Sequence, residues 1–139
     1  MDAEALLCDY AEALNGKLYI SGGGWSVVGL ARPLRCSLAI RLATGWSEAN
    51  VRQQLRVTLV TQDGQPALGP DGKPVLFEGD IEVGRPPGMA QGEDIVNCLV
   101  LSYEGLDLAA GSYEFKVEID AKVIKTVQFR VIRPEVPQQ

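Results

Sequence analysis

The chain has no histidine among its 139 residues. Histidine is the most frequent general base in enzymes and the most frequent metal ligand, so its absence excludes histidine-dependent hydrolases and histidine metal sites. Enzymes built on carboxylates, lysine or tyrosine are not excluded. Aromatic residues make up only 6% of the chain, which leaves few side chains for stacking on a sugar or a base.

The sequence also lacks the cysteine pattern of a disulfide framework and any segment that could span a membrane. The three cysteines, Cys8, Cys36 and Cys98, are odd in number and far apart, whereas a disulfide framework needs an even number. We interpret them as small core residues in a reducing compartment. The start, MDAEALLCDYAEAL, has acids but no basic region of a secretory signal, and no apolar run reaches the ~18 residues of a membrane span. These features predict a cytoplasmic protein with no membrane contact.

The charge balance argues against one class of partner. The chain carries 18 acidic and 13 basic residues, which gives a net charge of -5. An acidic domain is not attracted to a phosphate backbone, so we expect no nucleic-acid binding.

Apolar residues recur with a period of two, as in LRCSLAIRLA (34–43) and YEFKVEID (113–120). This period is typical of strands buried on one face, and Asn15-Gly16 is a strong hairpin signal between two such runs. We predict an all-β fold, an immunoglobulin-like antiparallel two-sheet β-sandwich of eight or nine strands, with at most one short helical turn, capped by Ser47. Residues 1–133 form a single domain in this prediction, and 134–139 form a flexible C-terminal tail.

The closing strands, LDLAAGSYEFKVEID and KTVQFRV, are similar to the final hairpin of immunoglobulin-like domains. In those domains a glycine turn leads into a strand that a tyrosine opens, which corresponds here to Gly111 and Tyr113. A tyrosine corner requires the Tyr113 hydroxyl to bond a backbone group upstream.

The stretch YISGGGWSVVG (19–29) is rich in glycine but fits no catalytic or phosphate-binding motif. A P-loop requires lysine and a hydroxyl where Leu30 and Ala31 stand, and a nucleophile elbow requires glycine where Val28 stands. We therefore interpret residues 22–24 as a bend or bulge, with Trp25 packed beside it.

Two groups of residues are candidates for a ligand or partner surface. Glu78, Asp80 and Glu82 share one face of a predicted strand and could hold a cation or a basic partner, or could simply form a solvated face that discourages edge pairing. Trp25 and Trp46 adjoin glycine-containing loops and could form a platform for sugars, or could pack in the core or against loops.

The opening block ALLCDYAEALNGKLYISGGGW, the element Trp46-Ser47-Glu48-Ala49-Asn50 and the strand Gly111 to Val117 resemble a family of small uncharacterised bacterial proteins, a domain of unknown function. This resemblance covers most of the chain. It implies a fold and a bacterial setting, and it assigns no activity and no catalytic residue.

The sequence therefore favours a non-enzymatic β-sandwich module that acts through protein–protein contact, with another protein or a second copy of itself bound through an edge strand. We expect no cofactor, catalytic residue or metal site. The alternative is a carbohydrate- or small-ligand-binding module that uses Trp25, Trp46 and the acidic strand. A third hypothesis is an enzyme that uses Glu78, Asp80 or Glu82.

Overall fold

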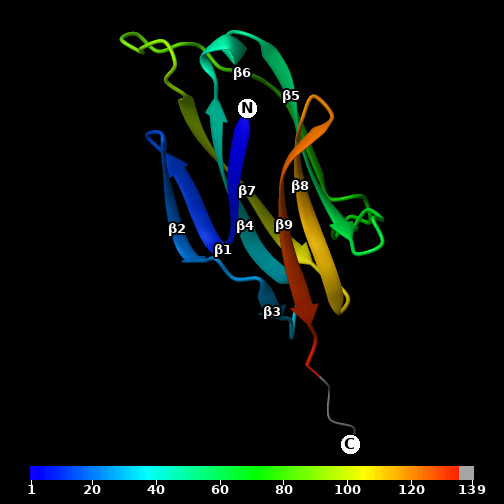
Figure 1. The fold of residues 1–139 in the computed structure, drawn as a ribbon. Coiled ribbons are helices and arrows are strands. Elements are labelled where there is room, and N and C mark those ends of the chain that lie inside the picture. Colours follow the sequence, from blue (N-terminus) through cyan, green and yellow to red (C-terminus); the bar gives the residue numbers. More distant parts are fainter. Residues whose placement is uncertain (135–139) are drawn as a thin grey trace, which may run out of the picture.

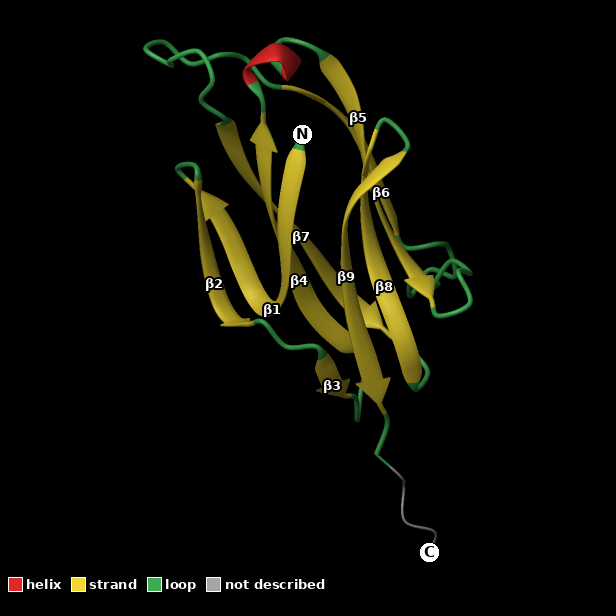
Figure 2. Cartoon of the chain, in the orientation of Figure 1, coloured by secondary structure: helices red, strands yellow, loops and turns green. Residues whose placement is uncertain are grey.

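The computed structural model describes residues 1–134 (Figures 1 and 2). Within these residues it has nine strands in two packed sheets that do not close into a barrel, and one 3₁₀ turn, η1 (Trp46–Glu48). The predicted β-sandwich is confirmed. The predicted tail, 134–139, lies outside the described residues apart from Pro134. The strands are β1 (Asp2–Leu14), β2 (Lys17–Gly23), β3 (Val27–Gly29), β4 (Leu34–Thr44), β5 (Arg52–Thr61), β6 (Leu76–Glu82), β7 (Ile95–Leu106), β8 (Gly111–Ile119) and β9 (Lys122–Ile132).

The two sheets enclose a core made by the alternating apolar residues. Sheet A has the order β2-β1-β4-β7, and sheet B has the order β3-β9-β8-β5-β6. The paired strands are antiparallel except for β3, which lies parallel to β9. The period of two turns every second residue of a strand toward the opposite sheet, which explains the burial pattern. Fully buried side chains on the central strands are Leu38, Ile40, Val57, Phe115 and Val117.

The β1–β2 hairpin forms at the predicted turn and folds back over sheet A. Asn15 and Gly16 have φ values of 52° and 73°, the left-handed conformation that a two-residue hairpin turn requires. Cys8 and Ala11 form a small buried cluster with Ala39 of β4. The partly buried side chains of Leu18 and Val100 pack against this cluster. The hairpin therefore covers part of the outer face of sheet A, at the left of Figure 1.

The triple glycine lets the chain leave the hairpin, as the sequence predicted. Gly22 and Gly24 have φ values of 60° and 90°, and the Gly24 amide donates a hydrogen bond to the Leu7 carbonyl at 2.8 Å. The positive φ favours glycine at position 22, and a Cβ atom there would also require the exposed Asp9 side chain to move. Trp25 follows and packs edge-on against Phe129, with ring centroids 6.1 Å apart.

The short turn differs from the prediction in its cap. The helical residues begin at Trp46, and Gly45 is the capping residue instead of Ser47. Glu48 explains the shift, because its carboxylate accepts hydrogen bonds from the Gly45 amide at 3.2 Å and from the Met1 ammonium at 2.6 and 2.7 Å. The hydrogen bond from the ammonium lowers the pKa of the Glu48 carboxyl.

The hydrogen bond of a tyrosine corner is present at the start of β8. The Tyr113 hydroxyl donates to the Ala109 carbonyl at 2.7 Å, four residues upstream, and the ring stacks on Phe129 with centroids 5.6 Å apart. This contact fixes the β7–β8 connection to the core. The wider immunoglobulin-like assignment stays a prediction. None of the helical structure in residues 1–134 is long and apolar enough to cross a bilayer.

Candidate functional site

The two tryptophans lie at opposite ends of the sandwich. Trp46 is in η1, which follows β4 at the top of Figure 2, whereas Trp25 precedes β3 at the bottom. The Arg85 guanidinium lies 4.1 Å from the centre of the Trp46 ring and donates hydrogen bonds of 2.7 and 3.3 Å to the Trp46 carbonyl. Trp25 is occupied by its contact with Phe129. The structure therefore does not bring the two rings together into one stacking platform.

The acidic row on β6 faces a partly basic row on β5. Glu78, Asp80 and Glu82 stand opposite Arg56, Gln54 and Arg52, respectively. The Arg56 side chain lies 3.4 Å from Glu78 and 4.0 Å from Glu118 of β8, and all three of these groups contact solvent. Across residues 1–134, no three acidic or cysteine side chains are arranged to hold a metal ion. Within residues 1–134, Glu78 is the one member of the acidic row that forms an ion pair with arginine, and Asp80 and Glu82 form none.

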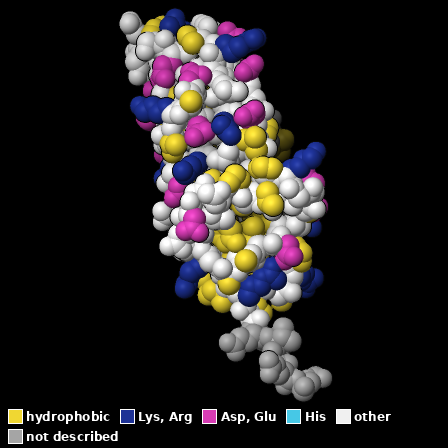
Figure 3. Space-filling model, turned by 90° about the vertical axis from the view of Figure 1, so that its right-hand side faces the viewer, with side chains coloured by type: hydrophobic (Ala, Val, Ile, Leu, Met, Phe, Trp, Pro, Cys, Tyr) yellow, Lys and Arg dark blue, Asp and Glu magenta, His cyan; other side chains and the backbone are white. Residues whose placement is uncertain are grey.

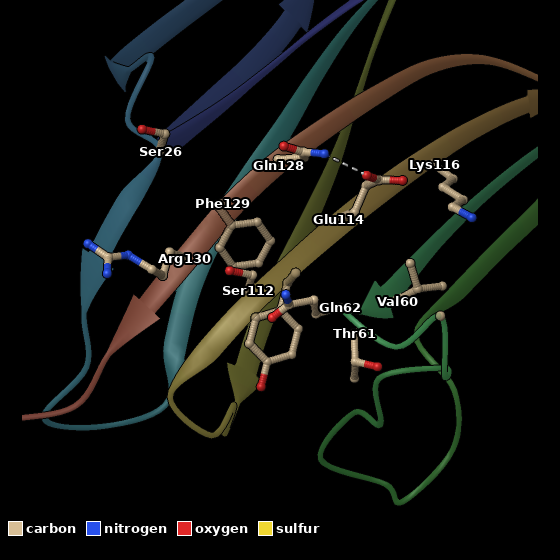
Figure 4. Close-up of a pocket in the computed structure, with 12 residues that line it drawn as sticks. Ser26, Val60, Thr61, Gln62, Ser112, Glu114, Lys116, Gln128, Phe129 and Arg130 are labelled. Atoms are coloured by element: carbon tan, nitrogen blue, oxygen red, sulfur yellow. Dashed lines mark hydrogen bonds between the residues drawn. The ribbon is translucent and has the colours of Figure 1, made fainter.

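A hollow of about 500 Å³ lies on the outer face of sheet B. Residues of β5, β8 and β9 and of the loop after β5 line it, and Figure 4 shows Lys116 and Arg130 on either side of a hydrogen-bonded Gln128–Glu114 pair, 3.0 Å apart. Figure 3 looks onto this side of the molecule, where charges of both signs are interspersed above and hydrophobic side chains gather below. The alternation in β8 and β9 turns these polar residues outward, which the sequence could predict. The hollow itself was not predictable, because its depth depends on the path of the loop that follows β5.

Strand β7 has an unpaired edge along most of its length. It is 12 residues long and pairs only with β4. In the part of the chain that the structure describes, no loop backbone hydrogen bond reaches it. At its lower end, Pro70 lies within 3.5 Å of the position that a Cβ atom on Gly105 would take, so the loop covers that end only. The exposed edge runs from Ile95 to Glu104 and is mostly apolar.

Sheet B continues beyond this edge with β5 and β6. Contact between Tyr103 and Phe115, with ring centroids 5.3 Å apart, places β7 against β8 across the core. Val57 of β5 is 0% exposed, but Phe77, its direct neighbour on β6, is 39% exposed although it points toward the same side. We call the free edge of β7 together with the inward side chains of β6 the β6–β7 edge.

A family model described as a family of unknown function (DUF6941) matches residues 4–132 of the chain. The chain belongs to this family. No curated protein matches it. The DUF6941 match runs from β1 to the last residue of β9, so it includes both sheets and the β6–β7 edge. It confirms the predicted resemblance to a family of unknown function and adds no activity, and the bacterial setting stays a prediction.

Proposed function

We propose that this DUF6941 protein is a non-enzymatic interaction module, which binds an extended segment of another protein as an added strand on β7. The observation that carries the proposal is the contrast between Val57, which is fully buried, and its cross-strand neighbour Phe77, which is 39% exposed. A strand hydrogen-bonded to β7 would extend sheet A in the direction of β5 and β6, the side on which Phe77 is exposed.

Strand addition would use both the free backbone of β7 and the inward side chains of β6. The unpaired backbone of β7 supplies hydrogen-bonding groups, and alternate side chains of the bound segment supply specificity. The segment's inward side chains would remove the apolar surface of β6 from water, which is favourable in proportion to the area covered. We place the protein in the bacterial cytoplasm, as the sequence favours, with no cofactor.

A peptide that can pair as a strand tests this proposal against one that cannot. The probe is acetyl-TVKVKVKVT-amide, and the control is the same peptide with N-methyl groups on all its interior residues, which block both hydrogen-bonding edges. We expect the plain peptide to slow amide hydrogen exchange within 95–104, and the methylated one to have no effect. Slowed exchange in β2 instead, or equal binding of both peptides, would contradict strand addition to β7.

A matched pair of aromatic substitutions tests the role of β6. Phe77→Ser should weaken peptide binding, because it removes the apolar surface that the peptide covers. Tyr19→Ser, which changes a 52% exposed aromatic residue on β2, should leave binding unchanged. Urea unfolding of both variants separates loss of binding from loss of fold.

The hollow on sheet B favours a second candidate, a small-ligand-binding module. Ser26 and Phe129 line the hollow and adjoin or contact Trp25, so Trp25 emission should report a bound ligand. A glycan array, followed by titration of tryptophan fluorescence with any glycan that binds, tests it. An emission change that survives Arg130→Ala would place the ligand elsewhere.

A further inference from the structure

The hollow on the outer face of sheet B contains an arginine, Arg130, that forms no ion pair within residues 1–134. Five other arginines of these residues have a partner, because four pair with carboxylates and one lies over an indole ring; they are Arg35, Arg41, Arg56, Arg133 and Arg85. An acid is within reach of Arg130, since Glu114 is its diagonal neighbour across β8 and β9. The two side chains nevertheless do not pair.

The Glu114 carboxylate interacts with a neutral group instead of with Arg130. It accepts a hydrogen bond from the Gln128 amide at 3.0 Å. Figure 4 shows the Arg130 side chain directed away from this pair, on the side of the hollow where Ser26 lies. One side of the hollow therefore carries a free positive charge, and a carboxylate beside it keeps acceptor positions that Gln128 does not use.

Serine hydroxyls lie on both sides of Arg130. Ser112 is its direct neighbour on β8, and Ser26 precedes Val27, its neighbour on β3. Both serines line the hollow. A guanidinium binds the two oxygens of a carboxylate through parallel N–H donors, and a serine hydroxyl can donate a further hydrogen bond. Arg130 and the two serines therefore offer a set of donors for one oxyanion.

A singly charged oxyanion suits this hollow better than a phosphate group does. The chain has a net charge of -5, and Glu114 lines the same hollow. A phosphate monoester carries about 1.5–2 negative charges at pH 7, so both features repel it more strongly than they repel a carboxylate. The charges therefore favour a carboxylic acid as the ligand of Arg130.

Other groups in the hollow require a ligand that also donates hydrogen bonds. The unused acceptor positions of Glu114 need donors, and Gln62 on the loop side presents both an amide oxygen and amide N–H groups. The hollow has a volume of about 500 Å³, which is within the range of pockets that bind small molecules. It therefore has space for a ligand that carries hydroxyl groups beside its carboxylate.

We propose that the hollow binds a hydroxylated carboxylic acid of the sugar-acid class; this inference rests on the second candidate function, ligand binding in the hollow, and is independent of strand addition. The carboxylate binds Arg130, Ser112 and Ser26. The hydroxyl groups donate to Glu114 and hydrogen-bond Gln62. A neutral sugar lacks the anion for Arg130, and an acid without hydroxyl groups lacks the donors for Glu114.

Three small molecules separate the two requirements: glucuronate, glucuronamide and cyclohexanecarboxylate. Glucuronamide keeps the hydroxyl groups but has no charge, and cyclohexanecarboxylate keeps the charge but has no hydroxyl groups. The readout is the amide chemical shifts of residues 112–114 and 128–130 during titration. We expect glucuronate to bind about tenfold more tightly than either of the other two, because each of them loses hydrogen bonds that involve a charged group.

A pair of arginine substitutions assigns the preference to the hollow. Arg130→Gln should weaken glucuronate binding about tenfold and leave glucuronamide binding within about twofold. Arg52→Gln removes an exposed arginine of β5 that does not line the hollow, and it should leave both affinities unchanged. An equal loss in the two variants would show that only the overall charge matters. Loss of the preference in Lys116→Gln instead of Arg130→Gln would place the carboxylate at the other side of the hollow. Either result would overturn the inference.

The outcomes separate the inference from the function on which it rests. If none of the three molecules shifts the amides of the hollow, ligand binding there is itself wrong. If glucuronate and glucuronamide bind equally well, the hollow binds ligands but the preference for an acid is wrong. If cyclohexanecarboxylate binds as tightly as glucuronate, the requirement for hydroxyl groups is wrong.

Discussion

Replacing Tyr113 with phenylalanine tests whether the closing hairpin is held by a single hydroxyl. The substitution keeps the ring, which is only 8% exposed and stacks on Phe129, and removes only the hydrogen bond to the Ala109 carbonyl at 2.7 Å. A net intramolecular hydrogen bond contributes about 0.5–1.5 kcal/mol. Ala109 is exposed, so water can replace the lost donor and the cost of an unsatisfied carbonyl is small. We therefore expect the free energy of unfolding to fall by about 1 kcal/mol.

Urea unfolding followed by circular dichroism measures this loss. With a slope of about 2 kcal/mol per M, the midpoint should fall by about 0.5 M without a change of slope. Tyr19→Phe is the control, since this tyrosine is 52% exposed and its hydroxyl makes no hydrogen bond to residues 1–134. Equal midpoints for Tyr113→Phe and Tyr19→Phe would refute the assignment of a structural role to the Tyr113 hydroxyl.

Three further predictions follow from glycine geometry and thiol burial. Gly22→Ala should cost more than about 1 kcal/mol, because φ is 60° and the added Cβ overlaps Asp9; a urea midpoint equal to that of the wild type would contradict this. In an Ellman assay of the native protein, half-buried Cys98 should react before Cys8 and Cys36, whose pKa values burial raises, and Cys98→Ser should remove that fast phase. Burial raises the pKa of Cys36 to about 12, above the value of about 8.5 of a free thiol, so its contribution to stability is complete below about pH 8.5 and is lost as the pH rises toward 12. Cys36→Ala should therefore show a shallower alkaline loss of stability in urea unfolding, and an unchanged slope with pH would refute it.

The alternating pattern predicted the strands because burial on one face leaves a period of two in the sequence. It identified the inward side of β4 through Leu38 and Ile40, and the inward side of β8 through Phe115 and Val117. The Asn15-Gly16 turn was predictable for a local reason, since its two residues adopt positive φ. The cap of η1 was not predictable, because Glu48 bonds groups that include the distant Met1 ammonium.

The candidate site depends on how strands of different sheets lie against one another, which no local pattern records. A period of two puts Phe77 and Ile81 on the face of β6 opposite the three acids, and this orientation is the same whether that face is buried or uncovered. Only the structure, with β6 at the end of sheet B and β7 at the end of sheet A, shows that Phe77 is left 39% exposed. Likewise, Trp25 and Trp46 follow glycines in the sequence, but the fold separates them.

The composition of β7 supports a role in binding rather than in packing alone. A long, apolar edge strand is a template for unwanted pairing, and proteins protect such edges with charges, prolines or covering loops. Here Pro70 covers the lower end, and the acids Glu93 and Asp94 at one end and Glu104 at the other flank an open backbone. The like charges of Glu93 and Asp94 oppose pairing with a second copy of the same edge. The open backbone between the two ends therefore remains available to the segment that we propose it binds.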